Sequence, residues 1–139
     1  MKLIENSRLY WEFIRELRYH PDNISGFVNT DPITKEDQVS YMQKHGDSYS
    51  ICIENDKPIG FIGEVDGDIR LAVSPTRKNQ GIGKFMLDEF MKTHPFATAK
   101  IKLDNISSLR TFYSCGFVSN KVDGEFHYLS RGEHGNYKI

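Results

Sequence analysis

Apolar and polar residues in the first third of the chain recur with the period of amphipathic helices. Residues 3–4 are apolar and predict a short first strand, and Asn6 or Ser7 is placed to cap the helix that follows. The predicted apolar face of this helix consists of Leu9, Phe13, Ile14 and Leu17. The helix ends by His20-Pro21, because the residue before a proline is biased away from the helical conformation.

A long loop and a second helix are predicted next. Residues 20–33 are rich in Pro, Gly, Asn and Asp, and loops of this length in compact domains are often binding segments. Thr34 and Asp37 have the spacing of a capping box, with Asp as its fourth member. They predict a helix that ends at Gly46.

The middle of the chain changes to strands separated by turns. Strands are predicted over residues 49–54, 58–65 and 68–73, with turns at residues 55–57 and at Asp66-Gly67. Because these connections are so short, the three strands are expected to form an antiparallel meander.

The C-terminal half alternates helix and strand. Ile82, Phe85, Met86 and Phe90 mark an amphipathic helix that ends near His94-Pro95. A strand over 99–103, a helix over 105–115 closed by Gly116 and a hairpin over 117–129 about Asp123-Gly124 follow. The whole order, β-α-α-β-β-β-α-β-α-β-β, predicts an α+β (α/β mixed) fold in a single domain over residues 1–139.

Composition narrows the class of protein. The 139 residues are 38% hydrophobic and 27% charged, which is ordinary for one globular domain. The net charge is −1 with no basic run, so we expect no nucleic-acid partner, and no apolar run approaches a membrane span. Residues 1–5 lack a signal-peptide core, and Cys52 and Cys115 match no paired pattern, so a reducing, cytoplasmic setting is expected. The five histidines show no ligand spacing, so no metal is expected.

The segment over residues 73–84 is the strongest chemical signal. The strand breaks at Pro75 and a polar loop enters a helix across Gly81 and Gly83, which leaves backbone N–H groups unpaired where the helix dipole favours an anion. The dinucleotide fingerprint fails at Met86, and the phosphate-binding P-loop fails at Lys78. A phosphate-bearing ligand of another kind is therefore predicted.

This segment resembles the acyl-CoA loop of the GNAT superfamily of N-acyltransferases, whose pattern is R/Q-x-x-G-x-G/A. Residues 78–83 read KNQGIG, with Lys78 in place of the usual Arg or Gln. A second block, NISSLRTFYSCGF at residues 105–117, is similar to the family's N-x-x-S/A, aromatic-Tyr and Gly-Phe sequence at about the family's distance. The resemblance covers nearly all of the chain and implies the GNAT fold, a central mixed, mostly antiparallel sheet splayed at the acyl-CoA site.

The resemblance also implies a pose for acetyl-CoA, the expected cosubstrate. Backbone groups of Leu71 and Val73 would pair with the pantetheine, and amides from Asn79 through Lys84 would hold the pyrophosphate. Asn105 would bond the pantetheine from the other side, although it could equally serve as a helix N-cap, or do both. The full expected cofactor set is Leu71, Ala72, Val73, Lys78, Asn79, Gln80, Gly81, Ile82, Gly83, Lys84, Asn105 and Ser108.

Candidate catalytic residues are Tyr113, Asp68 and Glu64. Tyr113 is the candidate acid for the leaving thiolate. The family's tyrosine, counted from Asn105, falls on Phe112, so either the helix shifts its register near Thr111 or Tyr113 points elsewhere and the enzyme lacks that acid. A purely structural role for Tyr113 would be packing beside Phe112. Asp68 is the leading base and Glu64 the reserve, although Asp68 could be merely a turn residue after Asp66-Gly67.

The expected function is transfer of an acetyl group from acetyl-CoA to a primary amine of a small molecule or protein by direct attack. Because a thioester is already activated, no covalent enzyme intermediate is needed. An acidic acceptor pocket would favour polyamines, whereas an open polar groove would favour a peptide. The alternative is a non-catalytic acyl-CoA-binding sensor or regulatory module, and a homodimer is a further expectation because dimers are common in this fold.

Overall fold

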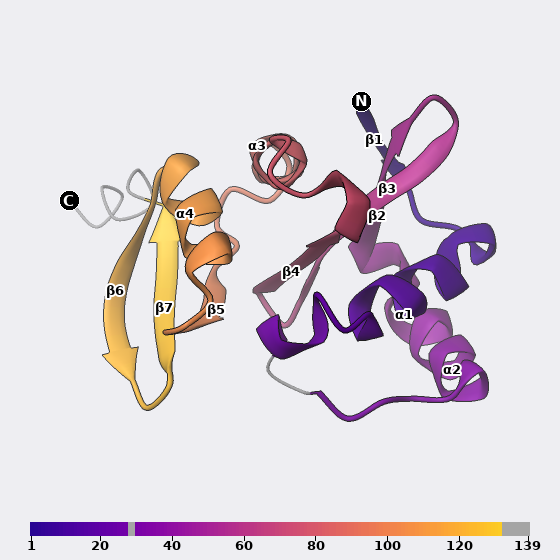
Figure 1. The fold of residues 1–139 in the computed structure, drawn as a ribbon, viewed down its shortest axis with the longest axis horizontal. Coiled ribbons are helices and arrows are strands. Elements are labelled where there is room, and N and C mark those ends of the chain that lie inside the picture. The colour runs from indigo at the N-terminus through magenta and orange to yellow at the C-terminus, as the bar shows by residue number, and fades with distance from the viewer. Residues whose placement is uncertain (28–29, 132–139) are drawn as a thin grey trace.

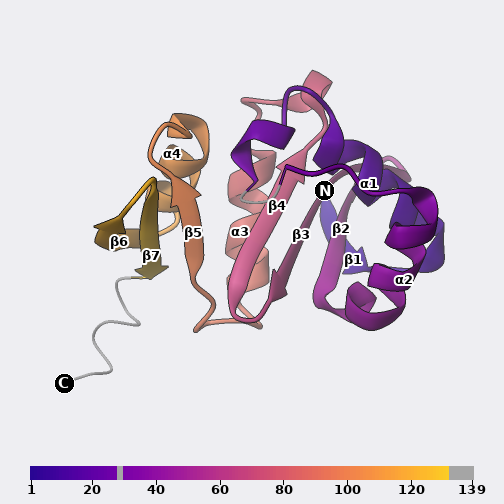
Figure 2. The same ribbon diagram turned by 90° about the horizontal axis from the view of Figure 1, so that it is seen from below.

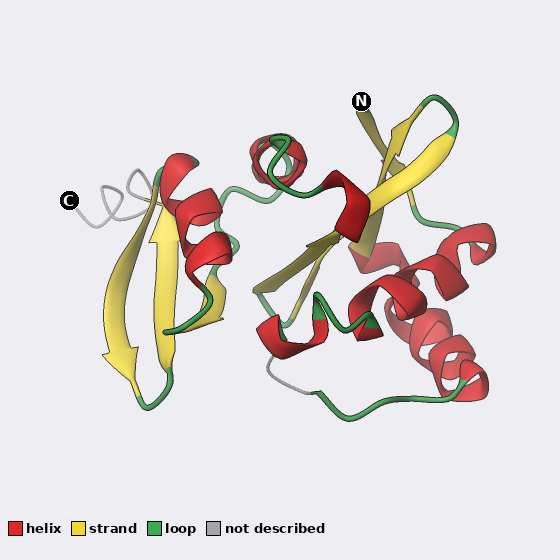
Figure 3. Cartoon of the chain, in the orientation of Figure 1, coloured by secondary structure: helices red, strands yellow, loops and turns green. Residues whose placement is uncertain are grey.

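The computed structural model describes residues 1–27 and 30–131, and it has two antiparallel sheets (Figures 1 and 3). The first sheet has the order β1-β2-β3-β4 and the second the order β5-β7-β6. The first comprises β1 (Lys2–Glu5), β2 (Tyr49–Glu54), β3 (Lys57–Val65) and β4 (Asp68–Val73). The second comprises β5 (Ala99–Lys102), β6 (Phe117–Asp123) and β7 (Phe126–Arg131). The predicted element order and fold class are confirmed.

Four helices cover the sheets, namely α1 (Trp11–Tyr19), α2 (Lys35–His45), α3 (Ile82–Met91) and α4 (Ile106–Ser114). Helices α1 and α2 lie on one side of the first sheet and α3 on the other, while α4 packs with the second sheet (Figures 1 and 2). The larger core lies between the two sheets, α3 and α4, and the smaller core lies under α1 and α2. No helix of the described residues is both long and apolar enough to cross a membrane.

The start of α2 has the predicted capping box. The Thr34 hydroxyl accepts a 3.1 Å bond from the Asp37 amide, and the Asp37 carboxylate accepts one of 3.5 Å from the Thr34 amide. The prediction for the first helix was wrong in two respects. Neither Asn6 nor Ser7 caps α1, whose N-cap is Tyr10. Leu9 lies in a 3₁₀ turn (Arg8–Tyr10) before α1 and is 79% exposed. The tighter turn rotates Leu9 away from the face shared by Phe13, Ile14 and Leu17.

Strands β4 and β5 run side by side but belong to different sheets (Figure 2). They meet in one parallel bridge between Asp68 and Thr98, where the Ile69 amide donates a 2.8 Å bond to the Thr98 carbonyl. Past this bridge no backbone hydrogen bond joins β4 to β5 among the described residues. The two strands therefore separate toward their C-terminal ends and leave the outer edge of β4 unpaired.

Candidate active site

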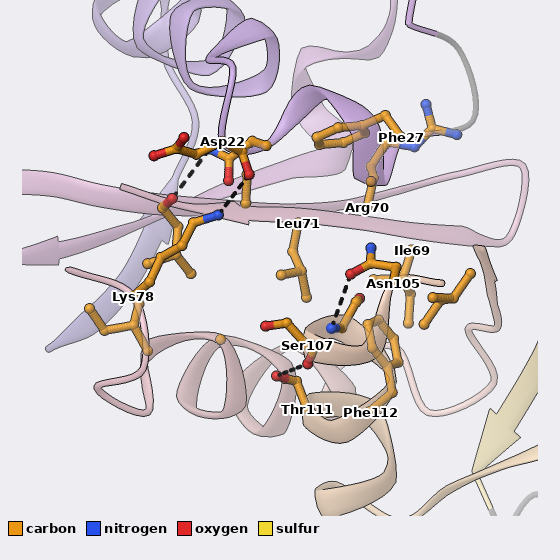
Figure 4. Close-up of a pocket in the computed structure, with 18 of the residues that line it drawn as sticks. Asp22, Phe27, Ile69, Arg70, Leu71, Lys78, Asn105, Ser107, Thr111 and Phe112 are labelled. Carbon is orange, nitrogen blue, oxygen red and sulfur yellow. Dashed lines mark hydrogen bonds between the residues drawn. The ribbon is translucent and has the colours of Figure 1, made fainter. Parts of the chain in front are cut away.

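A cavity of about 630 Å³ occupies the gap between β4 and β5 (Figure 4). Its walls are β4, the loop that follows β4, the start of α3, β5 with the residues after it, α4, and the end of α1 with the segment that follows it. Every residue of the expected cofactor set lines it except Gln80. The Gln80 side chain instead accepts a 2.8 Å hydrogen bond from Arg77 Nε.

The free edge of β4 presents backbone groups to this cavity. Neighbouring residues of a strand direct their N–H and C=O groups to opposite edges. Because the Ile69 amide points outward to Thr98, the N–H and C=O of Leu71, two residues on, point the same way. The N–H and C=O of Val73, two residues further along, also point outward, and its carbonyl accepts a 3.3 Å hydrogen bond from Asn23 Nδ2. Leu71 therefore offers one donor and one acceptor to a ligand that lies along β4.

The loop between β4 and α3 curls its backbone around the opposite end of the cavity. Asn79 and Gly81 both adopt positive φ, at 63° and 81°, and Gly81 is the N-cap of α3 without a side-chain cap. Alternation of left- and right-handed residues points successive amides toward one place, which suits an anion. The amides of Ile82, Gly83 and Lys84 form the first turn of α3, where the helix dipole adds positive potential.

Gly83 also lets α3 approach α4 closely. A Cβ at this position would stand 3.4 Å from Thr111 Cγ2, tighter than most carbon contacts. The two glycines thus have different roles: Gly81 supplies the left-handed turn and Gly83 the space between the helices.

Three basic side chains surround the loop, and each has a partner. Arg77 pairs with Glu54 at 2.7 Å, and Lys84 pairs with Asp88 at 2.9 Å. Lys78 Nζ donates a 3.0 Å bond to the Asp22 carbonyl and so ties the loop to the segment after α1 (Figure 4). The basic side chains therefore brace the loop while adding positive charge near the amides.

Asn105 is the N-cap of α4, as one of its two expected roles requires. Its Oδ1 accepts a 3.3 Å bond from the Ser108 amide. Its Nδ2 lies at the cavity beside Gly26, where an added Cβ would come within 2.8 Å. The cap therefore fixes the side chain and leaves its amide nitrogen directed toward the cavity (Figure 4).

Asp68 lies at the closed end of the gap. Its Oδ1 accepts a 3.1 Å bond from the Lys100 amide, and its Oδ2 stands 3.8 Å from Arg70 Nη2. Burial raises the pKa of the Asp68 carboxyl above its usual value, against the opposing effects of Arg70 and of the Lys100 amide. A carboxylate with a raised pKa beside a cavity is typical of a proton-accepting group.

The other two expected catalytic residues lie elsewhere. Helix α4 keeps its register through Thr111, so Phe112, 2% exposed, lines the cavity while Tyr113 is 44% exposed and outside its lining. The direction of Tyr113 therefore agrees with the second of the two alternatives. Glu64 pairs with Ile69 across β3 and β4 and also lies outside the residues that line the cavity.

Several cavity residues carry no signal in the sequence that would mark them as functional. Arg18, Arg70 and Lys100 bring three positive charges to the Asp68 end from α1, β4 and β5. Only Arg70 had a clue, since it alternates with Asp68 on one strand and so shares its face. Phe27 also lines the cavity, and it belongs to the long loop that the sequence indicated as a possible binding segment.

The two cysteines do not take part in the cavity. Both are free and buried, and Cys115 packs behind α3 and α4. Burial first, and then Asp88, raise the pKa of the Cys115 thiol to about 11. A thiol of this kind is protonated at neutral pH and is a poor nucleophile.

Comparison with known proteins agrees with this geometry. A family model described as "Acetyltransferase (GNAT) family" matches residues 8–117. Comparison with curated proteins gives no match.

Solved structures with the same fold are numerous. A putative acetyltransferase from Salmonella typhimurium with its cofactor acetyl-CoA has a TM-score of 0.74 at 16% identity, over 92% of this chain and 89% of that one. A spermidine N-acetyltransferase from Vibrio cholerae, in complex with CoA and spermine, has a TM-score of 0.72 at 14% identity, over 92% and 90%. A ribosomal-protein-alanine N-acetyltransferase from Brucella melitensis has a TM-score of 0.74 at 12% identity, over 93% and 96%. With the family model covering most of its length, the chain belongs to the acetyltransferase (GNAT) family.

Proposed function

We propose that this protein is an N-acetyltransferase that moves the acetyl group of acetyl-CoA to a primary amine by direct attack. The observation that carries the proposal is the joining of two features in one cavity. The unpaired edge of β4 at Leu71 continues directly into the amides at the start of α3. A ligand that combines an amide-bearing arm with a pyrophosphate fits both.

These two features support a pose for the cosubstrate. The pyrophosphate binds the amides from Asn79 to Lys84, and Lys78 and Lys84 add charge. The pantetheine arm then follows β4 as an extra strand and pairs with the N–H and C=O of Leu71. Asn105 Nδ2 donates to the arm from the α4 side. The arm thus brings the thioester toward the end of β4 where Asp68 and Arg70 lie.

The chemical step joins the amine nitrogen to the thioester carbonyl carbon and breaks the C–S bond. Asp68 accepts the proton that the amine must lose, directly or through water. Glu64 lies outside the cavity lining, so we assign it no proton. The products are the acetylated amine and CoA.

The leaving thiolate requires little help in this site. Thiols ionise near pH 8.5, so a thiolate is a far better leaving group than an alkoxide or amide. Phe112 stands at the α4 position that faces the cavity, and Tyr113 does not. We therefore propose that the sulfur takes its proton from solvent rather than from a tyrosine of α4.

The second candidate is a non-catalytic acyl-CoA sensor, and the placement of Tyr113 outside the cavity favours it. The two functions are separated by following free CoA thiol after acetyl-CoA is mixed with a panel of primary amines. Amine-dependent thiol release, with an Asp68→Asn variant that binds acetyl-CoA but turns over at least about tenfold more slowly, supports the enzyme. Tight acetyl-CoA binding without thiol release from any amine supports the sensor.

A further inference from the structure

The Asp68 end of the cavity is lined by more positive than negative side chains. Arg18, Arg70 and Lys100 line it, with Asp68 as the carboxylate among them. The cavity's other two lining carboxylates, Asp22 and Asp104, belong to the loops after α1 and after β5. A ligand with several positive charges would therefore meet net repulsion here.

One hydrogen-bonding atom of Arg70 is not satisfied by the described residues, although its guanidinium also interacts with the Tyr49 hydroxyl. Its side chain is 25% exposed, and its Nε is buried without a hydrogen-bond partner among those residues. Its Nη2 stands 3.8 Å from Asp68 Oδ2, beyond a direct hydrogen bond. A buried donor that lacks a partner is costly, and a guanidinium matches the two oxygens of a carboxylate.

Arg18 lies on the same side of the first sheet as Arg70. Its guanidinium packs over the Phe27 ring at 4.9 Å, and all three residues line the cavity. Both arginines also act on the same buried phenol: burial raises the pKa of Tyr49, and Arg70 and Arg18 oppose the rise. Arg70 extends to the α1 side of β4, opposite the side on which Leu71 points (Figure 4). Together with Arg18 of α1, it makes this side of β4 positive.

The positive field continues into a second hollow of about 520 Å³, which shares Asp68 and Lys100 with the first. Lys100 Nζ lies 4.3 Å from the centre of the Phe126 ring, and Lys121 Nζ lies 4.8 Å from that of Tyr128. This hollow runs over the exposed face of the second sheet and offers a route to the Asp68 end. A molecule that arrives by this route passes one further positive charge, that of Lys121.

We propose that the acceptor is a primary amine that also carries an oxyanion close to its nitrogen, as an amino acid does. The amine faces Asp68 and the oxyanion binds the Arg70 guanidinium, with Arg18 adding to the field. Asp68 and Arg70 alternate on one strand and stand 3.8 Å apart, so one small zwitterion can reach both. The inference rests on the proposed acetyltransferase function and narrows its acceptor class.

This choice differs from the acceptor of the similarly folded Vibrio cholerae enzyme, whose structure contains spermine. At 14% identity that likeness shows the fold and leaves the lining of the acceptor site to each chain. The charges beside Asp68 are the property that separates the two acceptor classes.

The test compares matched amines in the thiol-release assay. Each of a set of amino acids is paired with its α-carboxamide, and alanine is also compared with its aminophosphonate analogue and with spermidine. An amino acid amide loses its proton at lower pH than the free amino acid, so intrinsic reactivity favours the amide. We expect the carboxylate nevertheless to give a kcat/KM about tenfold to a hundredfold higher, the range for a charged hydrogen bond.

The Arg70→Gln variant should remove this preference by raising KM for the carboxylate, with little effect on the carboxamide. Arg110→Gln, an exposed arginine of α4 outside the cavity lining, is the matched control and should keep the preference. Acetyl-CoA affinity of Arg70→Gln should be unchanged, which shows that the variant folds. The comparison of alanine with its aminophosphonate analogue shows whether the site takes a planar or a tetrahedral oxyanion.

Results that contradict the acceptor class can be told apart from results that contradict the acetyltransferase function. Equal use of carboxylates and carboxamides, or better use of spermidine, overturns the inference and leaves the acetyltransferase function standing. An equal loss on both members of each pair in Arg70→Gln also overturns it, because the arginine would then be structural. Acetyl-CoA binding without turnover of any amine contradicts the proposed function itself, and the inference falls with it.

Discussion

The amide of Ile69 donates a 2.8 Å hydrogen bond to the carbonyl of Thr98, and beyond this pair β4 and β5 separate. A sheet that continued across β5 would consume the outward N–H and C=O of Leu71. Because β5 instead pairs with β7, these groups remain available inside a cavity. One backbone contact thus marks the boundary between a closed sheet and a ligand site.

Asn105 should contribute to both stability and acetyl-CoA binding. Asn105→Ala removes the N-cap of α4 and should cost about 1 kcal/mol of unfolding free energy. It also removes the Nδ2 donor, so the acetyl-CoA dissociation constant should rise about threefold to tenfold, as expected for one hydrogen bond. Urea unfolding and calorimetric titration measure the two effects.

Thr34→Ala is the matched control for Asn105. It removes the capping box of α2, which lies away from the cavity, and should cost a similar amount of stability. Its acetyl-CoA affinity should match wild type. If both variants bind acetyl-CoA equally well, Asn105 is a cap alone.

Gly81 should be required by its conformation. Its φ of 81° is strained for alanine, so Gly81→Ala should lose about 1 to 2 kcal/mol of stability or shift the loop. Either response moves the amides before α3, and acetyl-CoA affinity should fall at least about tenfold, the loss of one charge-assisted bond. Gly124→Ala, at a φ of 60° in the β6–β7 turn, carries a like strain without touching the cavity. A comparable affinity loss in the Gly124 variant would refute the loop assignment.

The ionisation of Asp68 should appear in the pH profile of kcat/KM as a fall in rate at acidic pH, the acidic limb of the profile. Its pKa is raised by burial, and only the ionised form accepts a proton, so kcat/KM should fall as pH drops through that raised pKa. In Asp68→Asn the rate should be low and this limb absent. A variant with the same acidic limb as wild type would assign the base elsewhere.

The stability of the Asp68→Asn variant follows from the same shift. A raised pKa means that the folded state binds the proton more tightly than the unfolded state, so ionised Asp68 lowers stability as pH rises through the folded pKa. At pH 7 Asp68→Asn should therefore melt no lower than wild type. A large drop in Tm would indicate that the carboxylate has a structural role through the Lys100 amide.

Tyr113 should be dispensable for catalysis. It is 44% exposed on the outer side of α4, so Tyr113→Phe should keep kcat within about twofold of wild type, as surface changes usually do. Steady-state kinetics with any amine that is turned over measures this. A loss of a hundredfold would mean that the hydroxyl reaches the sulfur during turnover.

The sequence predicted those elements whose signals are local. The Asp66-Gly67 turn, with φ of 55° and 83°, joins β3 to β4 as expected, because both residue types tolerate the left-handed conformation. Thr34 and Asp37 likewise fixed the start of α2. The loop between β4 and α3 was predictable for the same reason, since its backbone shape depends on Gly81 and its neighbours.

The proposed acceptor side could not be predicted, because its residues meet only in three dimensions. Arg18, Arg70 and Lys100 are far apart in the chain, and each alone reads as an ordinary surface charge. The prediction that Leu9 lies on the apolar face of the first helix was wrong for a related reason. A 3₁₀ turn at Arg8–Tyr10 interrupts the helical period on which this prediction depended. The position of Tyr113 was open because the sequence did not decide the register of α4.

The most direct test of the central claim is a thermal-shift titration with acetyl-CoA, with ATP as the comparison ligand. A ligand at 100 times its dissociation constant adds about 2.7 kcal/mol of stability, which raises Tm by several degrees in a domain of this size. We predict that acetyl-CoA produces this rise and that ATP, which has phosphates but no pantetheine arm for β4, does not. No rise with acetyl-CoA, or an equal rise with ATP, would contradict the assignment of the β4–α3 cavity as an acetyl-CoA site.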